Sequence, residues 1–371
     1  MKHLCANIAF VTALLIAVSA TAQKKSDVSR DQLIGPVHTA QIELAEVAVK
    51  DGKEVEIWRR PHQKVVYDQR GNEIERINFN QSGSIENRTV HVIDGNGRVS
   101  GWKEYEIDAG GSGERVTSWS EWLYDKAGNR VEARVYRGKD LSLQTVASYN
   151  PAGLITEETM IADGGAWKQT TKYGYDSNGR LASRLIDANG KTTLIEEAHD
   201  DAGNLISHKY TGPDGQNDGE VKYVYDAKGR EIERNSEDSH ARSKVVTAYD
   251  SKGRVSRRVT QFGYKRPNIK RSHEPEPGAV EFRYDENDKS VEERAYSVEG
   301  TLQRRIVIEY DGDGRMRSQI GYNADGAVTG KAIFERDKRG NCVKMLGISP
   351  GPNGMTVTSV QYHLITYYAE K

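Results

Sequence analysis

The sequence predicts an all-β protein, a long antiparallel meander of tandem β-hairpins that forms a curved or spiralling sheet of about 22 strands. Three observations support this fold class. Short alternating segments end in turn residues along most of the chain, and a Tyr-Asp-x-x-Gly motif recurs about every 26 residues. Hydrophobic residues make up only 36% of the 371 residues, and the mean hydropathy is −0.73. A thin sheet with two wetted faces needs few apolar residues.

Residues 172–181 show the repeating unit most clearly. Tyr173 and Tyr175 are two residues apart, so an extended chain directs both to the same face. Asp176 can bind the backbone two residues further on, and Asn178 and Gly179 tolerate the positive φ of a tight turn. The segment is therefore predicted to be a strand that ends in a hairpin turn.

Aspartate or asparagine follows each such strand, and we call this residue the anchor. The anchor and the three residues after it are called an anchor turn. The eleven anchors are Asp68, Asp94, Asp125, Asn150, Asp176, Asp200, Asp226, Asp250, Asp285, Asp311 and Asp337. Their spacing is 24 to 26 residues except for two intervals of 31 and 35. Tyrosine precedes the anchor except at Ile93, His199 and Arg336, and glycine follows three residues later except at Asp288. This regularity indicates a repeat architecture.

A second turn falls midway through most repeats, so each repeat contributes two strands. These turns lie at Gly83, Gly164, Gly190, Gly215, Gly300 and Gly326. The two long intervals are predicted to contain enlarged loops, near residues 110–113 and 265–277. Tyrosine side chains on neighbouring strands are expected to stack, and the glycine turns are expected to fix the register.

The chain divides into five predicted segments. Residues 1–22 have a charged start, an apolar run and Ala20-Thr21-Ala22, the form of a secretory signal peptide, with an uncleaved membrane anchor as the alternative. Residues 23–36 are predicted to be a flexible leader and 37–62 an N-terminal capping hairpin. The repeats span 63–347, and 348–371 form a closing strand. We therefore expect a secreted or periplasmic protein without a membrane span after cleavage.

The repeated motif resembles the YD repeat of Rhs-type proteins and of teneurin and toxin-complex shells. The resemblance rests on Tyr173-Gly174-Tyr175-Asp176-Ser177-Asn178-Gly179-Arg180 and on the equivalent run from Tyr223 to Arg230, and it covers about residues 65–347. It implies hairpins added side by side into a spiralling sheet, which in large members encloses a hollow and sometimes a toxic cargo domain.

No catalytic constellation is evident in the sequence, and we expect no enzyme activity, cofactor or bound metal. The segments 311–314 and 214–219 carry calcium-type aspartates, but both fall in register as turns. His199 occupies a tyrosine position of the repeat, so we interpret it as a substituted sheet residue. Cys342 is the only thiol after signal cleavage and is predicted to be a half-buried strand residue without a disulfide.

Two groups of side chains are candidates for ligand binding. Tryptophans can offer a platform for sugar rings, and a basic stretch can meet an acidic partner, although packing on neighbours and a solvated loop are the simpler interpretations. The candidates are Trp102, Trp119, Trp122 and Trp167, with Lys265, Arg266, Lys270 and Arg271. The net charge of −1 gives no field that favours nucleic acid.

Two functional hypotheses follow. The first is a secreted, non-enzymatic scaffold that binds a cell-surface carbohydrate or protein. The alternative is a shell or carrier that encloses or delivers a separate toxin or effector. Positions that break the repeat register, Ile93, His199, Asp288 and Arg336, are expected to be the more informative places to look for function. The oligomeric state and the closure of the sheet are left open.

Overall fold

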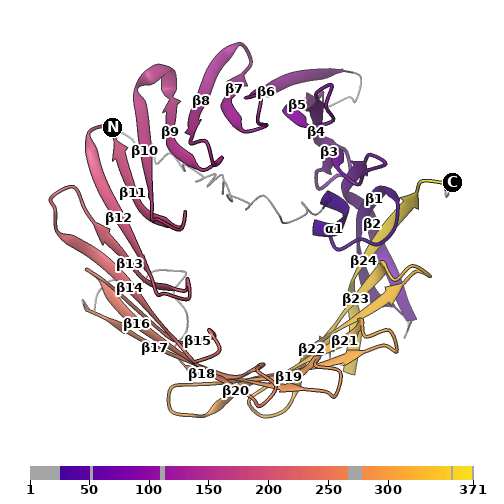
Figure 1. The fold of residues 1–371 in the computed structure, drawn as a ribbon. Helices are drawn as coiled ribbons and strands as arrows, with labels where there is room; N and C mark the ends of the chain where they lie inside the picture. The colour runs from indigo at the N-terminus through magenta and orange to yellow at the C-terminus, as the bar shows by residue number, and fades with distance from the viewer. Residues whose placement is uncertain (1–25, 51–52, 109–112, 266–277, 352–353, 370–371) are drawn as a thin grey trace, which may run out of the picture.

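The computed structural model describes residues 26–50, 53–108, 113–265, 278–351 and 354–369, which form a ring of β-strands around a central opening (Figure 1). All 24 strands belong to one antiparallel sheet. They are β1 (Val37–Lys50), β2 (Lys53–Tyr67), β3 (Glu73–Phe79), β4 (Ile85–Ile93), β5 (Val99–Ile107), β6 (Glu114–Tyr124), β7 (Arg130–Arg137), β8 (Asp140–Tyr149), β9 (Ile155–Ala162), β10 (Trp167–Tyr175), β11 (Leu181–Ala188), β12 (Lys191–His199), β13 (Leu205–Thr211), β14 (Asn217–Tyr225), β15 (Glu231–Asp238), β16 (Ala241–Tyr249), β17 (Val255–Tyr264), β18 (Gly278–Tyr284), β19 (Ser290–Tyr296), β20 (Leu302–Tyr310), β21 (Met316–Asn323), β22 (Val328–Arg336), β23 (Cys342–Gly351) and β24 (Gly354–Tyr367). A short helix, α1 (Asp27–Arg30), and a 3-10 turn, η1 (Asp163–Gly165), are the other described elements. The predicted all-β class is confirmed.

The sheet closes on itself. Each strand pairs with the next along the chain, and β24 pairs antiparallel with β1 from Val37 opposite Tyr367 to Glu46 opposite Ser359. The meander is therefore a β-barrel. The barrel has 24 strands, two more than the 22 expected. The ten intervals between Asp68 and Asp337 supply β3 to β22, two strands precede Asp68, and two follow Asp337.

The anchor turns use the hydrogen bonds that the sequence suggests. In the turn after β10, the Gly179 N–H donates to the Asp176 carbonyl (3.0 Å), and Asp176 Oδ1 accepts the N–H groups of Asn178 and Arg180 (both 2.9 Å). Gly179 has a φ of 74°, a conformation that suits glycine. Because successive turns alternate between the two ends of the strands, all eleven anchor turns lie on one rim of the barrel.

Tyrosine hydroxyls tie each anchor turn to the preceding repeat. Tyr175 donates to the Ile155 carbonyl, five residues after the previous anchor (2.7 Å). The same bond joins Tyr124 to Val99, Tyr149 to Arg130, Tyr225 to Leu205, Tyr249 to Glu231, Tyr284 to Val255 and Tyr310 to Ser290. We call these bonds the rim latches. They explain why the motif needs tyrosine rather than phenylalanine.

Positions that break the tyrosine register mostly keep a latch by other means. Arg336 Nη2 donates to the Met316 carbonyl (3.1 Å), which is the equivalent acceptor. In the repeat that ends at Ile93, the His91 Nδ1 atom lies 2.7 Å from the equivalent carbonyl, that of Glu73. His199 makes no such bond within the described part of the chain. Arg336 and the Ile93 repeat therefore have structural explanations.

The missing latch at His199 gives a prediction. His199→Tyr should place a hydroxyl near the Leu181 carbonyl and raise the free energy of unfolding by about 0.5–1 kcal/mol, whereas Tyr310→Phe should lower it by about 1 kcal/mol. Urea unfolding followed by circular dichroism measures both. Equal stabilities of Tyr310→Phe and wild type would show that the latches contribute nothing.

The last anchor turn holds the two ends of the chain together. The side-chain amides of Asn72, Asn129 and Asn204 donate to the carboxylate of their own anchor. Asn341 occupies the equivalent position, but its amide donates to the Ile34 carbonyl (2.9 Å) and the Tyr367 hydroxyl (2.6 Å), and it accepts the Ile34 N–H (2.7 Å). The Tyr367 hydroxyl donates to Asp337. We call Ile34, Asp337, Asn341 and Tyr367 the clasp.

Residues 26–36, predicted to be part of a flexible leader, instead pack on the barrel. Val28 of α1 is buried with Val37, Val65 and Tyr67 in one apolar cluster. Asp27 also accepts the N–H of Glu73 (2.6 Å). The sequence of the leader, which is mostly polar, did not predict the apolar contact that Val28 makes. The predicted signal peptide and most of the two predicted insertions lie outside the described residues.

The capping hairpin and the closing strand both enter the barrel wall. The hairpin predicted at 37–62 extends to Tyr67, where β2 reaches the first anchor turn. The segment predicted at 348–371 contains the end of β23 and all of β24, and β24 closes the sheet. The described residues contain no helix with the length and apolar character that crossing a membrane requires.

Candidate functional site: the lumen wall

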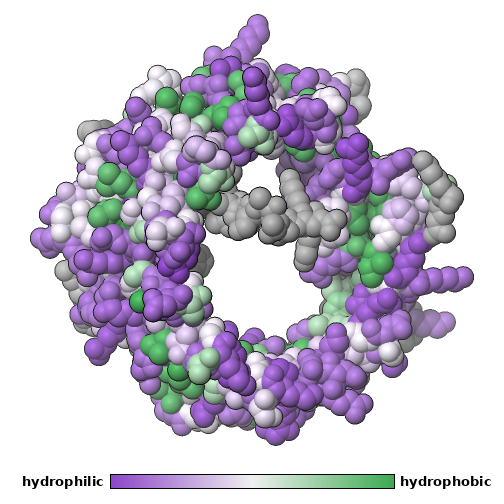
Figure 2. Space-filling model, in the orientation of Figure 1, coloured by the Kyte–Doolittle hydropathy of each residue, from purple (hydrophilic) through white to green (hydrophobic). Residues whose placement is uncertain are grey.

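One face of the sheet lines the opening. Helix α1 lies on the inner side of the ring next to β1 and β2 (Figure 1), and it packs against Val65 and Ala40, which are paired across these strands. The face that carries Val65 is therefore the lumen face. The space-filling view shows an open centre bounded by a mixture of apolar and polar side chains (Figure 2).

On β10, β14 and β16 the lumen face is the less exposed face. On β14, Gly219, Val221 and Tyr223 share the lumen face and are buried or half-buried, whereas Lys222 and Val224 on the other face are exposed. Thr171 on β10 and Thr247 on β16 are likewise buried on the lumen face. Side chains on the concave side of a closed sheet converge, which accounts for the difference. The outer face carries more lysine and glutamate.

The predicted tryptophans do not form one platform. Strand register places Trp102, Trp122 and Trp167 on the lumen face, on β5, β6 and β10, and Trp119 on the outer face. Trp119 stacks on Tyr136 with ring centroids 3.9 Å apart. Arg130 lies over the Trp122 ring at 4.9 Å. All four are half-buried, so packing on neighbours accounts for part of each side chain.

Titratable groups on the lumen wall favour their neutral forms. Burial raises the pKa of Glu158, which lies between Ala147 and Thr171 in the sheet register. Burial lowers the pKa of His208, whose ring stacks on Tyr210 at 4.7 Å. Burial raises the pKa of Tyr173 to about 12. Burial on this wall therefore disfavours the charged forms of Glu158 and His208.

The lumen wall carries few charged pairs between β9 and β13. One described ion pair there joins Arg184 Nη2 to Glu197 Oε1 (3.0 Å). The described ranges contain no group of three or more His, Cys, Asp or Glu side chains placed to hold a metal ion. The wall presents aromatic rings, aliphatic groups and hydroxyls to the lumen.

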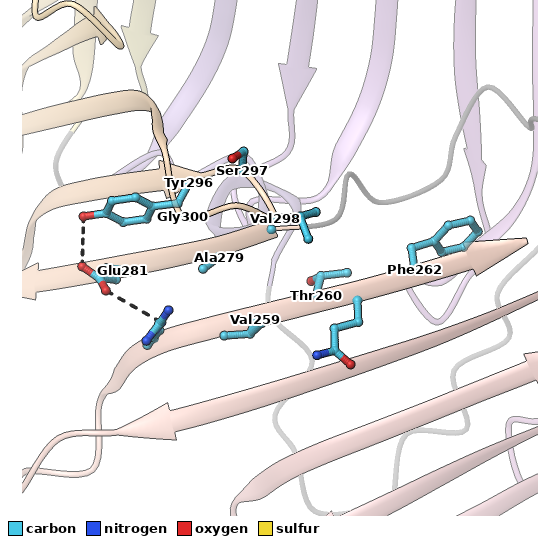
Figure 3. Close-up of a pocket in the computed structure, with 12 residues that line it drawn as sticks. Val259, Thr260, Phe262, Ala279, Glu281, Tyr296, Ser297, Val298 and Gly300 are labelled. Carbon is cyan, nitrogen blue, oxygen red and sulfur yellow. Dashed lines mark hydrogen bonds and ion pairs between the residues drawn. The ribbon is translucent and has the colours of Figure 1, made fainter.

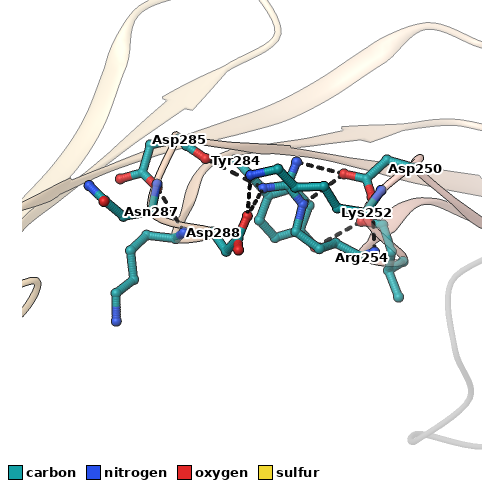
Figure 4. Close-up of polar contacts among 9 residues, drawn as sticks. Asp250, Lys252, Arg254, Tyr284, Asp285, Asn287 and Asp288 are labelled. Atoms are coloured by element: carbon teal, nitrogen blue, oxygen red, sulfur yellow. Dashed lines mark hydrogen bonds and ion pairs between the residues drawn. The ribbon is translucent and has the colours of Figure 1, made fainter.

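Asp288 occupies the glycine position of its anchor turn and forms a link between two turns (Figure 4). Its φ of 62° is unusual for a residue with a side chain. Its Oδ1 atom accepts from Lys252 Nζ (2.9 Å) and Arg254 Nη1 (2.6 Å). Arg254 also lies over the Tyr284 ring at 4.4 Å. The substitution therefore adds an exposed ion pair between neighbouring repeats, and nothing here points to a ligand.

The remaining predicted site residues fall into two groups. Lys265 reaches β15, where its Nζ pairs with Glu237 Oε1 (2.6 Å). Arg266, Lys270 and Arg271 lie outside the described residues. Cys342 opens β23 as a half-buried residue, as predicted, and burial raises the pKa of its thiol. A raised pKa disfavours the reactive thiolate.

The aspartate-rich segments that resemble calcium loops are turns. In the turn after β20, Asp311 Oδ1 accepts the N–H groups of Asp313 (3.0 Å) and Arg315 (2.9 Å). In the turn after β13, the Gly215 N–H donates to the Gly212 carbonyl (3.0 Å). These are the hydrogen bonds of hairpin turns.

Neither a protein-family model nor a curated protein matches this chain. Among solved structures, the chain is similar to the crystal structure of TcdB2-TccC3-Cdc42, with 10% identity, a TM-score of 0.37, and coverage of 89% of this chain and 21% of that one. It is also similar to the crystal structure of TcdB2-TccC3, with 11% identity, a TM-score of 0.37, and coverage of 86% of this chain and 20% of that one. A porin-like protein from Bacteroides uniformis has 9% identity, a TM-score of 0.22, and coverage of 90% of this chain and 99% of that one. The chain spans about a fifth of the length of the TcdB2-TccC3 structures.

Proposed function

We propose that this chain is a non-enzymatic shell that encloses a segment of another polypeptide in its lumen. The observation that carries the proposal is closure, since β24 pairs with β1 and completes a wall around the opening. Closure favours the shell hypothesis over an open binding scaffold. The recurring motif supports the inference that the chain is a small relative of YD-repeat proteins.

The size of the barrel fits a polypeptide guest. Twenty-four strands spaced ~4.8 Å apart give a perimeter of at least ~115 Å and a backbone diameter of at least ~37 Å. Side chains that take ~5 Å from each wall leave at least ~27 Å. A helix with its side chains is ~10–12 Å across, so one or two helices or an extended chain fit with room to move.

The outer face supports a barrel surrounded by water. A lipid-facing barrel needs a continuous apolar band on its outside. Here Lys172, Lys222, Lys244 and Glu196 lie at mid-strand positions of the outer face. With the predicted signal peptide, this supports a secreted or periplasmic protein without a membrane span.

Photo-crosslinking tests the enclosed guest. A benzoylphenylalanine in place of Tyr210 would sit on the lumen face, and one in place of Val224 would sit on the outer face as the matched control. Irradiation in the native host should give a discrete polypeptide adduct at position 210 and none of the same mass at 224. Adducts of the same protein at both positions would contradict enclosure, and so would solution scattering of an open ribbon.

A further inference from the structure

A recess on the outer face of the barrel wall lies beside the end of β17, past the first described residue of β18. Strand β18 begins at Gly278 and pairs with β17 only from Arg257 to Thr260, although β17 continues to Tyr264. The recess of about 420 Å³ lies between β17, β18 and the turn after β19 (Figure 3). Its volume falls within the range of small-molecule sites.

Small residues form the floor of the recess and leave its volume open. Ala279 is buried there, and a Cβ atom at Gly278 would lie 2.2 Å from the Tyr296 carbonyl oxygen, so only glycine fits. Tyr296 stands beside Ala279 on the outer face of the wall, whereas Phe262, which also lines the recess, lies on the lumen face in the register of β17 (Figure 3). Val298 has 67% of its surface exposed, the highest value among the large hydrophobic residues described. The recess thus has an apolar surface that water covers in the free protein.

The recess contains both hydrogen-bond donors and hydrogen-bond acceptors. The Tyr296 hydroxyl donates to Glu281 Oε2 (3.1 Å), and Arg257 Nε lies 3.7 Å from Glu281 Oε1 (Figure 3). Gln261 lines the same recess from the outer face, and its side chain has no hydrogen-bond partner among the described residues. Carboxylate, guanidinium, amide and hydroxyl groups together accept and donate to a ligand.

We propose that this recess binds a neutral saccharide ring. The charges of Arg257 and Glu281 offset one another, which disfavours an anionic or a cationic ligand. The unpaired amide of Gln261 disfavours a purely apolar one. A sugar ring has an apolar C–H face to pack on Tyr296 and Val298, and hydroxyls that both donate and accept. The volume admits one or two rings. The shell proposed above does not depend on this site.

Binding can be tested with the full chain and a glycan array of neutral hexose and N-acetylhexosamine oligosaccharides. The strongest array ligand is then titrated by isothermal calorimetry against wild type, Glu281→Ala and Ala279→Leu. We expect at least a tenfold loss of affinity for Glu281→Ala, which removes charged acceptors, and loss of binding for Ala279→Leu, which fills the floor. Glu220→Ala, on the outer face of β14, is the control and should bind like wild type.

Melting curves separate a lost site from a lost fold. Gln261→Ala is a milder variant that removes an unpaired amide and should weaken binding severalfold without a change in melting temperature. The proposal is overturned if no array saccharide binds at millimolar concentration, or if affinity is the same in Glu281→Ala, Ala279→Leu and wild type. Parallel titrations with acetate and with cyclohexanol would overturn the ligand class if either bound more tightly than every saccharide.

Discussion

Asn341→Ala is expected to lower the free energy of unfolding by about 2–4 kcal/mol, the largest effect of any single side-chain truncation proposed here. The side chain is 1% exposed and makes three hydrogen bonds in the clasp. Truncation removes those bonds and leaves the Ile34 N–H and carbonyl without their partners. An unsatisfied buried group costs about 1–3 kcal/mol, which sets the upper part of the range. Urea unfolding at neutral pH measures the loss.

The matched control is Asn129→Ala. Asn129 occupies the same position of its repeat, but its amide donates only to Asp125 Oδ2 (2.9 Å) within one turn. We expect a loss below about 1 kcal/mol. Hydrogen exchange adds a local test, because Asn341→Ala should reduce protection in β1 and β24 more than in β10 to β14. Equal losses in the two variants would show that the clasp is an ordinary anchor turn.

The repeat unit could be predicted from the sequence because its determinants are local. Tyr175, Asp176 and Gly179 lie within five residues, and the turn that they form depends on hydrogen bonds inside that segment. The class of fold follows from repeating such a unit. The rim latches were not predicted, since each joins a tyrosine to a carbonyl 18 to 29 residues earlier.

Closure could not be predicted from the sequence. Asn341 occupies the same motif position as Asn72 and Asn204, yet its amide turns to Ile34 because the end of β24 brings Tyr367 to Asp337. Only the curvature accumulated over all strands decides whether these groups meet. A small change of twist at each strand would separate β1 from β24, and local motifs do not fix a sum of that kind.

The candidate sites were predicted less well than the fold. Tryptophan composition pointed to β5, β6 and β10, but the alternation of faces separates Trp119 from Trp102 and Trp122. The saccharide recess was missed because Glu281, Tyr296 and Gln261 come from three strands with ordinary sequences. The recess lies beside the end of β17, and the one sequence signal for it was the long interval between the anchors Asp250 and Asp285.

The barrel is expected to lose stability as pH falls from about 4 to about 2. The pKa of Asp226 is lowered to about 2 by its bond to the Arg230 side chain and by the Arg230 N–H. The pKa values of eight other anchors are lowered as well, those of Asp68, Asp94, Asp125, Asp176, Asp200, Asp250, Asp311 and Asp337. In the unfolded chain an aspartate has its ordinary pKa near 3.8. Between these values the unfolded chain binds more protons, so acid favours unfolding, and the stabilisation is fully present only above pH 4.

Asp226→Asn tests the contribution of one anchor. Asn150 shows that asparagine forms the turn, since its Oδ1 accepts the N–H groups of Ala152 (3.0 Å) and Leu154 (2.9 Å). The variant should lose stability at neutral pH through the Arg230 ion pair, and its urea midpoint should then fall less steeply with acid than that of wild type. Lys228→Ala, in the same turn, should keep the wild-type slope. Asp226→Asn has one anchor carboxylate fewer than wild type, so it must take up about one proton fewer on acid unfolding. If the urea midpoints of wild type, Asp226→Asn and Lys228→Ala fell in parallel from pH 4 to 2, anchor protonation would not be what unfolds the barrel.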